Sequence, residues 1–471
     1  MAIKRYIPMI ALWAILSHAV AFAGQGALSG VVVDKGTGKP LAGVSVWVRD
    51  TALIATTKED GSYTIPMVPE GTYTVVASKV GYVGVQHSVR VVPGQETQLD
   101  FQLPPGVFEL EKVVVTAVPV ERSIKDLSAT VSVVEQEDIE GSTAANAIDL
   151  LTMLPGVFVS KQEAFGRSDI YIRGIGQRGR RLMVLIDGRP VKMGIFGCTV
   201  THSLPLDNVE RIEVVRGPSS VLYGSDAMGG VVNIITKEAR HPAEADFTVS
   251  YGTYSTQRYL LRYGGRRGPM DWYLTAGRRS SDGHRPNGEY ESWDYTGRLG
   301  YALTDQVRMS LLGKYFHGEK REPGPITAPT PDAWDDYERG AVDLTLNGIW
   351  RESEWTLKLY RNFGEHKFSD GFHCKDFTLG GSLRSTVKPL VNTLLTGGVE
   401  FRQQGGEQLA ELTFAKKGKW DKTEYALFAQ GEHTLLGYLI LSAGMRFNHD
   451  TISGNEWIPH LGLVAHATET T

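Results

Sequence analysis

Short stretches in which hydrophobic and polar residues alternate fill much of this chain, and a period of two predicts β-strands. In the first part they cover residues 28–33, 44–48, 62–65, 73–77, 85–91 and 98–103. Turn-forming sequence separates them, as in the run 35–40 and at Pro93-Gly94. About six short strands in so short a segment predict a small antiparallel β-sandwich over residues 26–103.

A different pattern follows the sandwich. Apolar residues at helical spacing over residues 144–154 predict a short helix, which Pro155-Gly156 ends. Four β-rich runs come next, at residues 170–174, 183–188, 209–218 and 222–236. Residues 120–240 are therefore expected to form an α+β domain.

Beyond about residue 245 we expect about a dozen strands, up to the end of the chain. Five of the candidates are 247–251, 295–301, 341–346, 355–360 and 438–441. Short turns such as Gly264-Gly265 alternate with long polar segments such as 279–291 and 318–336, a pattern typical of a transmembrane antiparallel β-barrel. The following aromatic residues are candidates for its membrane interfaces: Trp272, Tyr273, Trp293, Trp350, Trp355 and Trp457. A soluble all-β domain is the alternative.

The first 23 residues have the features of an export signal. Lys4 and Arg5 precede an apolar run over residues 7–22, and Ala21-Phe22-Ala23 fits a small-residue cleavage site. An uncleaved membrane anchor is the alternative. Export would place the chain in a compartment where its two cysteines can form a disulfide.

Composition excludes several classes of protein. The chain has 49 Lys and Arg against 53 Asp and Glu, so its net charge of −4 does not favour nucleic acid as a partner. Two cysteines cannot make a disulfide-rich scaffold or a zinc module of four cysteines. After the N-terminus no apolar run is long enough for a transmembrane helix.

The string G-x-V-x-D…G-x-P-L-A-G-V-x-V…T-x-x-D-G-x-Y-x-I…P-x-G-x-Y-x-V in the sandwich resembles the carboxypeptidase regulatory-like domain. This module contains no His/Glu metal pair of the kind that a peptidase needs. We therefore expect no enzyme activity and no cofactor, although the name of the domain suggests a peptidase.

The four β-rich runs resemble the plug domain of TonB-dependent outer-membrane receptors, and they occur in the order found there. The first three end in Arg173-Gly174, Asp187-Gly188 and Arg216-Gly217-Pro218, and the last is the string 222–236. The resemblance implies a mainly β protein of the bacterial outer membrane: a β-sandwich, an α+β plug and the first part of a transmembrane β-barrel around it. A β-prone heptapeptide upstream of the plug is similar to the Ton box, the segment that binds TonB; one more sandwich strand is the alternative. Its residues are Glu111, Lys112, Val113, Val114, Val115, Thr116 and Ala117.

From residue 245 onward 227 residues remain, about half of what the roughly 22 strands of a plugged transporter need. We expect a fragment or a truncated gene product. A natural barrel of about twelve strands, the alternative, would be too narrow for this plug.

Three sets of side chains are candidate sites. Arg173 and Arg216 are expected to pair with carboxylates of the barrel's inner wall, the alternative being solvated arginines. A basic cluster could attract an anionic chelate or could be internal to the plug and barrel. It contains Arg178, Arg180 and Arg181. The third set is Cys198 with His202 in the plug and His373 with Cys374 in the barrel. The two cysteines could form a disulfide with each other, remain free thiols, or bind copper or zinc together with the histidines.

The function that the resemblance implies is active uptake of a scarce small extracellular ligand, with TonB and its inner-membrane energising complex and the outer-membrane lipid as partners. A ferric siderophore is the first candidate ligand, and cobalamin, haem, a transition metal ion such as copper, an oligosaccharide or a peptide are alternatives. A surface adhesin or a phage or bacteriocin receptor without transport is the competing class.

Overall fold

A computed structural model describes residues 25–465 except for the gaps 50, 52, 80, 81, 83, 105–113, 116–121, 124–129, 162–164, 177–179, 391, 412–415 and 436–437. The predicted signal peptide and most of the predicted Ton box lie outside the described residues. The chain divides into two compact units, Met1–Lys112 and Val113–Thr471. Within the described ranges, no helix is both long enough and apolar enough to cross a membrane.

The first unit is the predicted β-sandwich. One sheet contains β4 (Ser62–Pro69), β1 (Gln25–Asp34), β7 (Glu96–Gln98) and β8 (Phe101–Leu103), and the other has the order β3 (Ile54–Thr56), β2 (Ser45–Val48), β5 (Gly71–Ser78), β6 (Val85–Val91). Alternate residues of these strands form the core. Two details differ from the prediction: the run 98–103 is divided between two strands, and both pair with β1 in parallel.

The plug contains two small sheets. The larger has the order β11 (Thr130–Val134), β17 (Val209–Arg216), β18 (Gly230–Thr236), β15 (Met183–Ile186), β16 (Arg189–Pro190), and the smaller the order β12 (Val157–Lys161), β13 (Ser168–Ile172), β14 (Ile175–Gly176). The short helices are α1 (Gln136–Glu140), η2 (Asp149–Met153), η3 (Thr201–Ser203), α2 (Ser220–Tyr223) and η4 (Ser225–Ala227). All four residues of β15 are buried, which explains its continuous apolar sequence.

The helix predicted over residues 144–154 is wrong in extent, because only the 3-10 helix η2 forms there. The side-chain Oδ1 of Asn146 accepts the backbone N–H groups of Ile148 and Asp149 at 3.0 and 3.2 Å, which makes a turn in place of the first helical turn. The N–H of Ala147 donates to Leu204 O at 2.9 Å, so this residue pairs with a distant segment.

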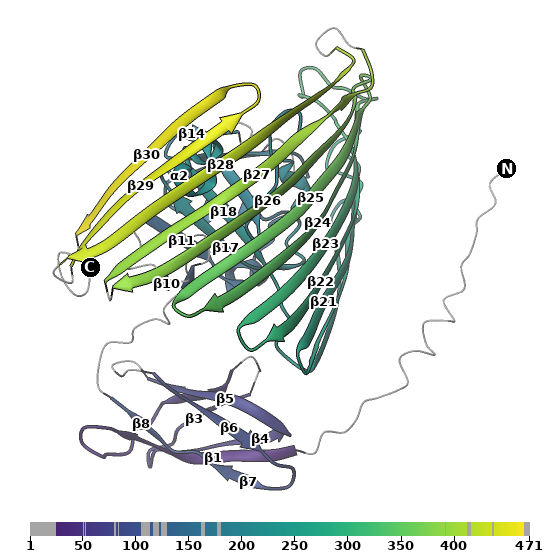
Figure 1. The fold of residues 1–471 in the computed structure, drawn as a ribbon. Coiled ribbons are helices and arrows are strands. Elements are labelled where there is room, and N and C mark those ends of the chain that lie inside the picture. The colour runs from purple at the N-terminus through teal and green to yellow at the C-terminus, as the bar shows by residue number, and fades with distance from the viewer. Residues whose placement is uncertain are drawn as a thin grey trace. The chain divides into compact units, whose positions relative to one another are not determined.

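The predicted dozen strands are confirmed: an antiparallel sheet of twelve strands follows the plug in sequence order. The strands are β19 (Ala243–Gly252), β20 (Thr256–Arg267), β21 (Met270–Ser281), β22 (Tyr290–Thr304), β23 (Val307–Arg321), β24 (Trp334–Trp350), β25 (Ser353–Phe368), β26 (His373–Leu390), β27 (Thr393–Gln408), β28 (Gly418–Leu435), β29 (Leu439–Asp450) and β30 (Gly454–Ala465). In the described part of the chain the sheet is open, with β19 and β30 as its outer strands. The plug lies within the curve of this sheet (Figure 1).

Connections of two sizes alternate from β20 to β25. Two-residue turns follow β20, β22 and β24, and at the opposite edge residues 282–289 and 322–333 form longer loops. Gly264 and Gly265, predicted as a turn, lie inside β20 instead. A Cβ at Gly265 would lie 2.4 Å from the Trp272 ring, so glycine lets the tryptophan of the next strand cover the backbone.

Side chains alternate between the two faces of the sheet, as expected for a membrane barrel. Trp293, Trp350 and Trp457 are exposed on the outer face, the face on which residues of a membrane interface would lie. Tyr273 is buried and lies on the inner face, so its predicted place at an interface is wrong. Buried polar residues of the inner face include Asp271, Asp294, Asp343 and Asp376, which therefore face the plug.

Candidate plug–barrel interface and outer recess

Asp207, between η3 and β17, is the plug carboxylate with the most barrel cations around it. Its Oδ1 lies 2.5 Å from Arg258 Nη2 and 2.8 Å from Arg279 Nη2, and its backbone oxygen accepts a hydrogen bond from Arg262 Nε at 3.0 Å. Burial alone would raise the pKa of Asp207, but the positive charges of Arg279 and Arg258 outweigh it and hold the pKa below its usual value. Asp207 is therefore ionised and joins the plug to β20 and β21.

Arg189, on the outer strand β16 of the larger plug sheet, makes an equivalent contact. Its Nε lies 2.9 Å from Asp343 Oδ2, and its Nη1 donates to Asn362 Oδ1 at 2.6 Å. Lys358 Nζ lies 3.2 Å from the other Asp343 oxygen. The side chains of Arg189 and Asp343 are 2% and 4% exposed, so either charge would be left buried without its partner if the plug moved away.

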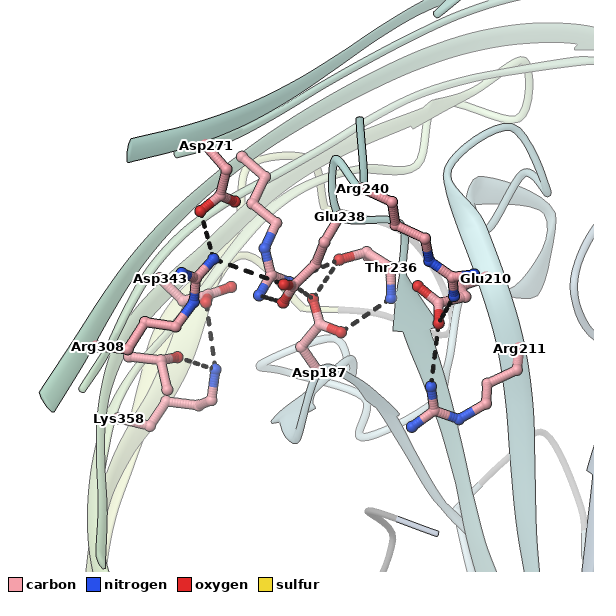
Figure 2. A network of polar contacts seen from close by, with 12 residues as sticks. Asp187, Glu210, Arg211, Thr236, Glu238, Arg240, Asp271, Arg308, Asp343 and Lys358 are labelled. Atoms are coloured by element: carbon pink, nitrogen blue, oxygen red, sulfur yellow. Dashed lines mark hydrogen bonds and ion pairs between the residues drawn. The ribbon is translucent and has the colours of Figure 1, made fainter. Parts of the chain in front are cut away.

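A third polar network surrounds Asp187, in the turn between β15 and β16. Its carboxylate accepts hydrogen bonds from the N–H and the hydroxyl of Thr236 at 2.9 and 2.6 Å, and Arg298 of β22 lies 3.5 Å away. Figure 2 shows Asp187 turned toward Thr236, and Arg308 of β23 turned toward Asp271. Arg298 and Arg308 also pair with Glu238, so this network continues from the plug into the barrel wall.

The short helix α2 is held by barrel arginines through its carbonyl oxygens. Arg446 Nη1 donates to Val221 O at 3.4 Å, and Arg384 Nη2 donates to Leu222 O at 3.2 Å. Arg384 also lies over the ring of Tyr223, 5.2 Å from its centroid. Glu400 of β27 lies 2.7 Å from Arg446, which compensates part of this positive charge.

Asp226 follows α2 and contacts one cation of the plug and one of the barrel. It lies 2.9 Å from Lys192 Nζ and 3.5 Å from Arg402 of β27. Burial would raise the pKa of Asp226, but Lys192 and Arg402 outweigh that effect and lower it. Like Asp207, this carboxylate is charged and bridges the two domains.

Arg173 and Arg216 contact the plug itself and not the barrel wall as we expected. Arg173 Nη2 donates to Thr130 Oγ1 at 3.3 Å, and Arg216 Nη2 donates to Ser132 Oγ at 2.9 Å. Arg216 also donates to Pro155 O. Among the described residues, both arginines therefore tie β11 to the rest of the plug, and the expected barrel carboxylates do not contact them.

The predicted basic cluster is only partly described. Arg180 and Arg181 are exposed, and Arg178 lies outside the described residues. From the predicted Ton box only Val114 and Val115 are described, as strand β9 (Val114–Val115), which pairs with β10 (Arg122–Ser123). Its other residues, Glu111, Lys112, Val113, Thr116 and Ala117, lie outside the described part.

The structure brings Cys198 and Cys374 into one cluster at the plug–barrel boundary, and both are free thiols. The two histidines do not complete a metal site. His202 packs edge-on against the ring of Tyr337, and His373 Nε2 lies 2.7 Å from Glu365 Oε1. Burial, with Lys320 nearby, holds the pKa of His202 well below its usual value, so its ring is neutral. No group of three metal-ligating side chains occurs in the ranges that the structure describes.

A recess of about 430 Å³ opens at the edge of the sheet that carries the long loops. Phe165 of the plug and Tyr290 of β22 belong to its lining and stack on each other, with ring centroids 4.4 Å apart. The lining includes the cations Arg285, Lys320 and Arg321 and the carboxylate Glu289. Lys320 is already paired with Asp335 at 3.0 Å. Aromatic and cationic groups together suit a ligand that is both aromatic and anionic.

Sequence reasoning missed the carboxylates of this interface, Asp187, Asp207, Asp226 and Asp343. One signal was present: Asp271, Asp294 and Asp343 each stand between two aliphatic or aromatic residues of their strand, on the opposite face of the sheet from those neighbours. An aspartate at such a place is expected to face a partner inside the barrel.

Three protein-family models match the chain: CarboxypepD_reg-like domain over residues 28–115, TonB-dependent Receptor Plug Domain over 123–231, and TonB dependent receptor-like, beta-barrel over 239–471. Among curated proteins, Vitamin B12 transporter BtuB of Vibrio vulnificus is 33% identical over 373 residues, which cover 75% of this chain and 60% of the relative. Iron-regulated outer membrane virulence protein of Vibrio cholerae is 25% identical over 380 residues, 74% of this chain and 56% of the relative.

Solved structures show the same fold. The siderophore receptor PirA from Acinetobacter baumannii superposes with a TM-score of 0.60 at 20% identity, covering 74% of this chain and 60% of that one. The ferric citrate transporter FecA gives a TM-score of 0.60 at 18% identity over 74% and 62% of the two chains. The chain spans about 60% or less of the length of these curated relatives. With its plug, its barrel strands and its preceding CarboxypepD_reg-like domain, the chain belongs to the TonB-dependent receptors of the outer membrane.

Proposed function

We propose that this protein takes up a scarce ligand across the outer membrane by active, TonB-dependent transport. The observation that carries the proposal is the set of ion pairs at Asp207, Arg189 and Asp226, which join the plug to the barrel wall; Asp207 and Arg189 are buried, and Asp226 is half-buried. Removing one partner from a buried pair costs about 3–5 kcal/mol. Opening a path past the plug therefore requires work, and binding of a small ligand alone is not expected to supply it.

The segment 111–117 is the proposed point where that work enters. The only pairing described for it is the two-residue ladder between β9 and β10. So short a ladder offers few hydrogen bonds, and a partner that adds the segment as a strand to its own sheet can replace it. We propose that TonB is that partner, energised by its inner-membrane complex.

Tension on this segment would reach the larger plug sheet at β11, the first strand of that sheet along the chain. β11 is the outer strand of the larger plug sheet and pairs only with β17 there. Arg173 and Arg216 hold it through Thr130 and Ser132. In this scheme, β11 detaches first. The rest of the plug stays in the barrel until its ion pairs with the barrel wall also break.

A ferric siderophore is the proposed ligand, with cobalamin as the second candidate. The aromatic and cationic lining of the outer recess favours an anionic, aromatic iron chelate. The relatives include a vitamin B12 transporter and an iron-regulated protein, and the fold relatives include siderophore receptors. Haem and copper remain further candidates, and a purely adhesive or phage-receptor role is the competing class.

Uptake by bacteria that express the protein from its own gene tests this proposal. Cells are supplied in parallel with radiolabelled ferric siderophores of several chemical types and with labelled cobalamin, with and without TonB. The proposal expects one ligand to accumulate only in cells that have both this protein and TonB. Surface binding without TonB-dependent accumulation of any ligand would favour the adhesin or receptor class and contradict transport.

A further inference from the structure

The plug loop 193–198, which precedes η3, packs directly on the inner face of β26. Its backbone closes a tight turn in which the N–H of Met193 donates to Cys198 O at 2.9 Å and the N–H of Gly197 donates to Met193 O at 3.0 Å. The N–H of Gly194 donates to Asp376 Oδ1 at 2.8 Å. A Cβ at Gly194 would lie 2.2 Å from Phe377 O, so the loop and the barrel strand are in backbone contact.

This contact brings the two cysteines of the chain into one cluster across the boundary between plug and barrel. Cys374 precedes Asp376 by two residues on β26, so it faces the same way and lies about 6–7 Å along the strand. It is fully buried in a cluster with Met193, and Cys198 packs against that cluster. Cys198 Sγ lies 3.5 Å from Met193 Sδ.

The surroundings of the thiols favour a neutral product over a charged one. The cluster is apolar and includes Phe316, Tyr337 and Phe372. Burial raises the pKa of the Cys198 thiol, so little thiolate is present at neutral pH and its exchange with a disulfide is slow. A disulfide carries no charge and needs no third ligand, and the described residues offer no third His, Cys, Asp or Glu for a metal.

We propose that Cys198 and Cys374 are an oxidisable pair whose disulfide ties the plug to the barrel wall. The oxidant is a low-molecular-weight disulfide of the extracytoplasmic medium. Cys198, the more accessible thiol, loses its proton and attacks the oxidant, which forms a mixed disulfide and releases one thiol. Cys374 then loses its proton and attacks the Cys198 sulfur, which forms the bond between the two residues and releases the second thiol. Both electrons end on the oxidant, which leaves as two thiols.

The bond would restrain the loop 193–198 against β26. If transport requires the plug to move, the oxidised protein binds ligand and does not carry it across the membrane. This consequence rests on the proposed function, whereas formation of the bond does not. The two are therefore measured separately.

The bond is tested on the protein in outer-membrane vesicles. After treatment with oxidised glutathione, free thiols are blocked with a maleimide under denaturing conditions, and the protein is digested without reductant. We expect no labelled cysteine and one peptide pair joined at Cys198 and Cys374, which reductant separates. Cys198→Ser and Cys374→Ser should each show one remaining free or glutathione-bound thiol and no joined pair. Two maleimide-labelled cysteines in the oxidised wild type would overturn the proposal, as would protection of both thiols by zinc or copper in place of oxidation.

The consequence for transport is measured in cells that express the protein. Oxidation should lower ligand uptake at least tenfold in the wild type, with surface binding unchanged and uptake restored by reductant. Cys374→Ser should transport equally well under both conditions. If the joined peptide forms and uptake persists, the restraint on the plug is refuted although the disulfide stands. If neither redox state transports any ligand, the proposed function fails and the disulfide is unaffected.

Discussion

Replacing Asp207 by Asn tests whether buried charge pairs hold the plug in the barrel. The substitution keeps the size and shape of the side chain and removes its charge. Arg258 and Arg279 then lose the carboxylate that lies 2.5 and 2.8 Å from their Nη2 atoms. The bond from Arg262 to the backbone oxygen of residue 207 is unaffected by the change.

The expected magnitude follows from these contacts. A hydrogen bond to a charged group contributes about 1.5–3 kcal/mol, and two are affected here. Asn can still accept one weaker bond, and the Arg258 side chain is 31% exposed, so water can solvate part of it. We therefore expect a loss of about 3 kcal/mol in the free energy that holds the plug closed, which is roughly a 150-fold change in the opening equilibrium.

Hydrogen–deuterium exchange of the protein in detergent micelles, across a urea series, measures this free energy. Peptides that cover β17 and β18 report opening of the plug sheet. Asp246→Asn is the matched control, because Asp246 pairs with Arg262 at 3.0 Å and its side chain is 53% exposed, which predicts a loss of under about 1 kcal/mol. Equal protection of β17 and β18 in the two variants would refute the reasoning.

Three further predictions concern pH, packing and the sandwich. The pKa of Asp207 is lower in the folded plug than the ordinary 3.8, so the stabilisation by this carboxylate is complete at neutral pH and is lost as the pH falls through the lowered value. The difference in hydrogen exchange between wild type and Asp207→Asn should therefore shrink at acid pH. A difference that stays constant with pH would contradict this. Gly194→Ala should weaken the packing of the plug on the barrel by about 1–3 kcal/mol, because the added Cβ would overlap Phe377 O. Gly313→Ala, where the added Cβ has open space, should leave hydrogen exchange unchanged. Similar effects of the two substitutions would count against the packing argument. Thr57→Val should destabilise the sandwich by about 1–3 kcal/mol, because the buried hydroxyl accepts a hydrogen bond from Val44 N–H at 2.9 Å and donates one to Leu41 O at 2.6 Å. Hydrogen exchange of β2 and β4 measures this loss. The substitution Thr51→Val, at an exposed residue, should cost less, and the reverse order would contradict the role given to the Thr57 hydroxyl.

The strands were predictable because burial on one face imposes a period of two that does not depend on distant contacts. The exceptions have local causes. Asn146 forms a turn where helical spacing predicted a helix, and Gly265 makes room for Trp272 where two glycines predicted a turn. Neither effect is visible in the hydrophobic pattern alone.

The interface was harder to predict than the strands. Periodicity indicates that Asp343 faces inward but not which plug residue it meets, because Arg189 is 154 positions away in sequence. The same limit applies to Arg173 and Arg216. Their type and spacing suited a carboxylate, yet their partners are the hydroxyls of Thr130 and Ser132 within the plug. The cysteines were recognised as a possible pair because the chain has only two.

Transport driven through the segment 111–117 is the central claim, and a proline substitution there tests it most directly. Val114→Pro removes a backbone donor and restricts φ, which prevents the segment from pairing as a strand with TonB. Val107→Pro, upstream of the segment, is the matched control. We predict that Val114→Pro abolishes uptake of the ligand that the wild type accumulates, while binding of this ligand at the cell surface persists. We predict that Val107→Pro transports the ligand normally. Uptake by Val114→Pro at the rate of Val107→Pro would contradict the account.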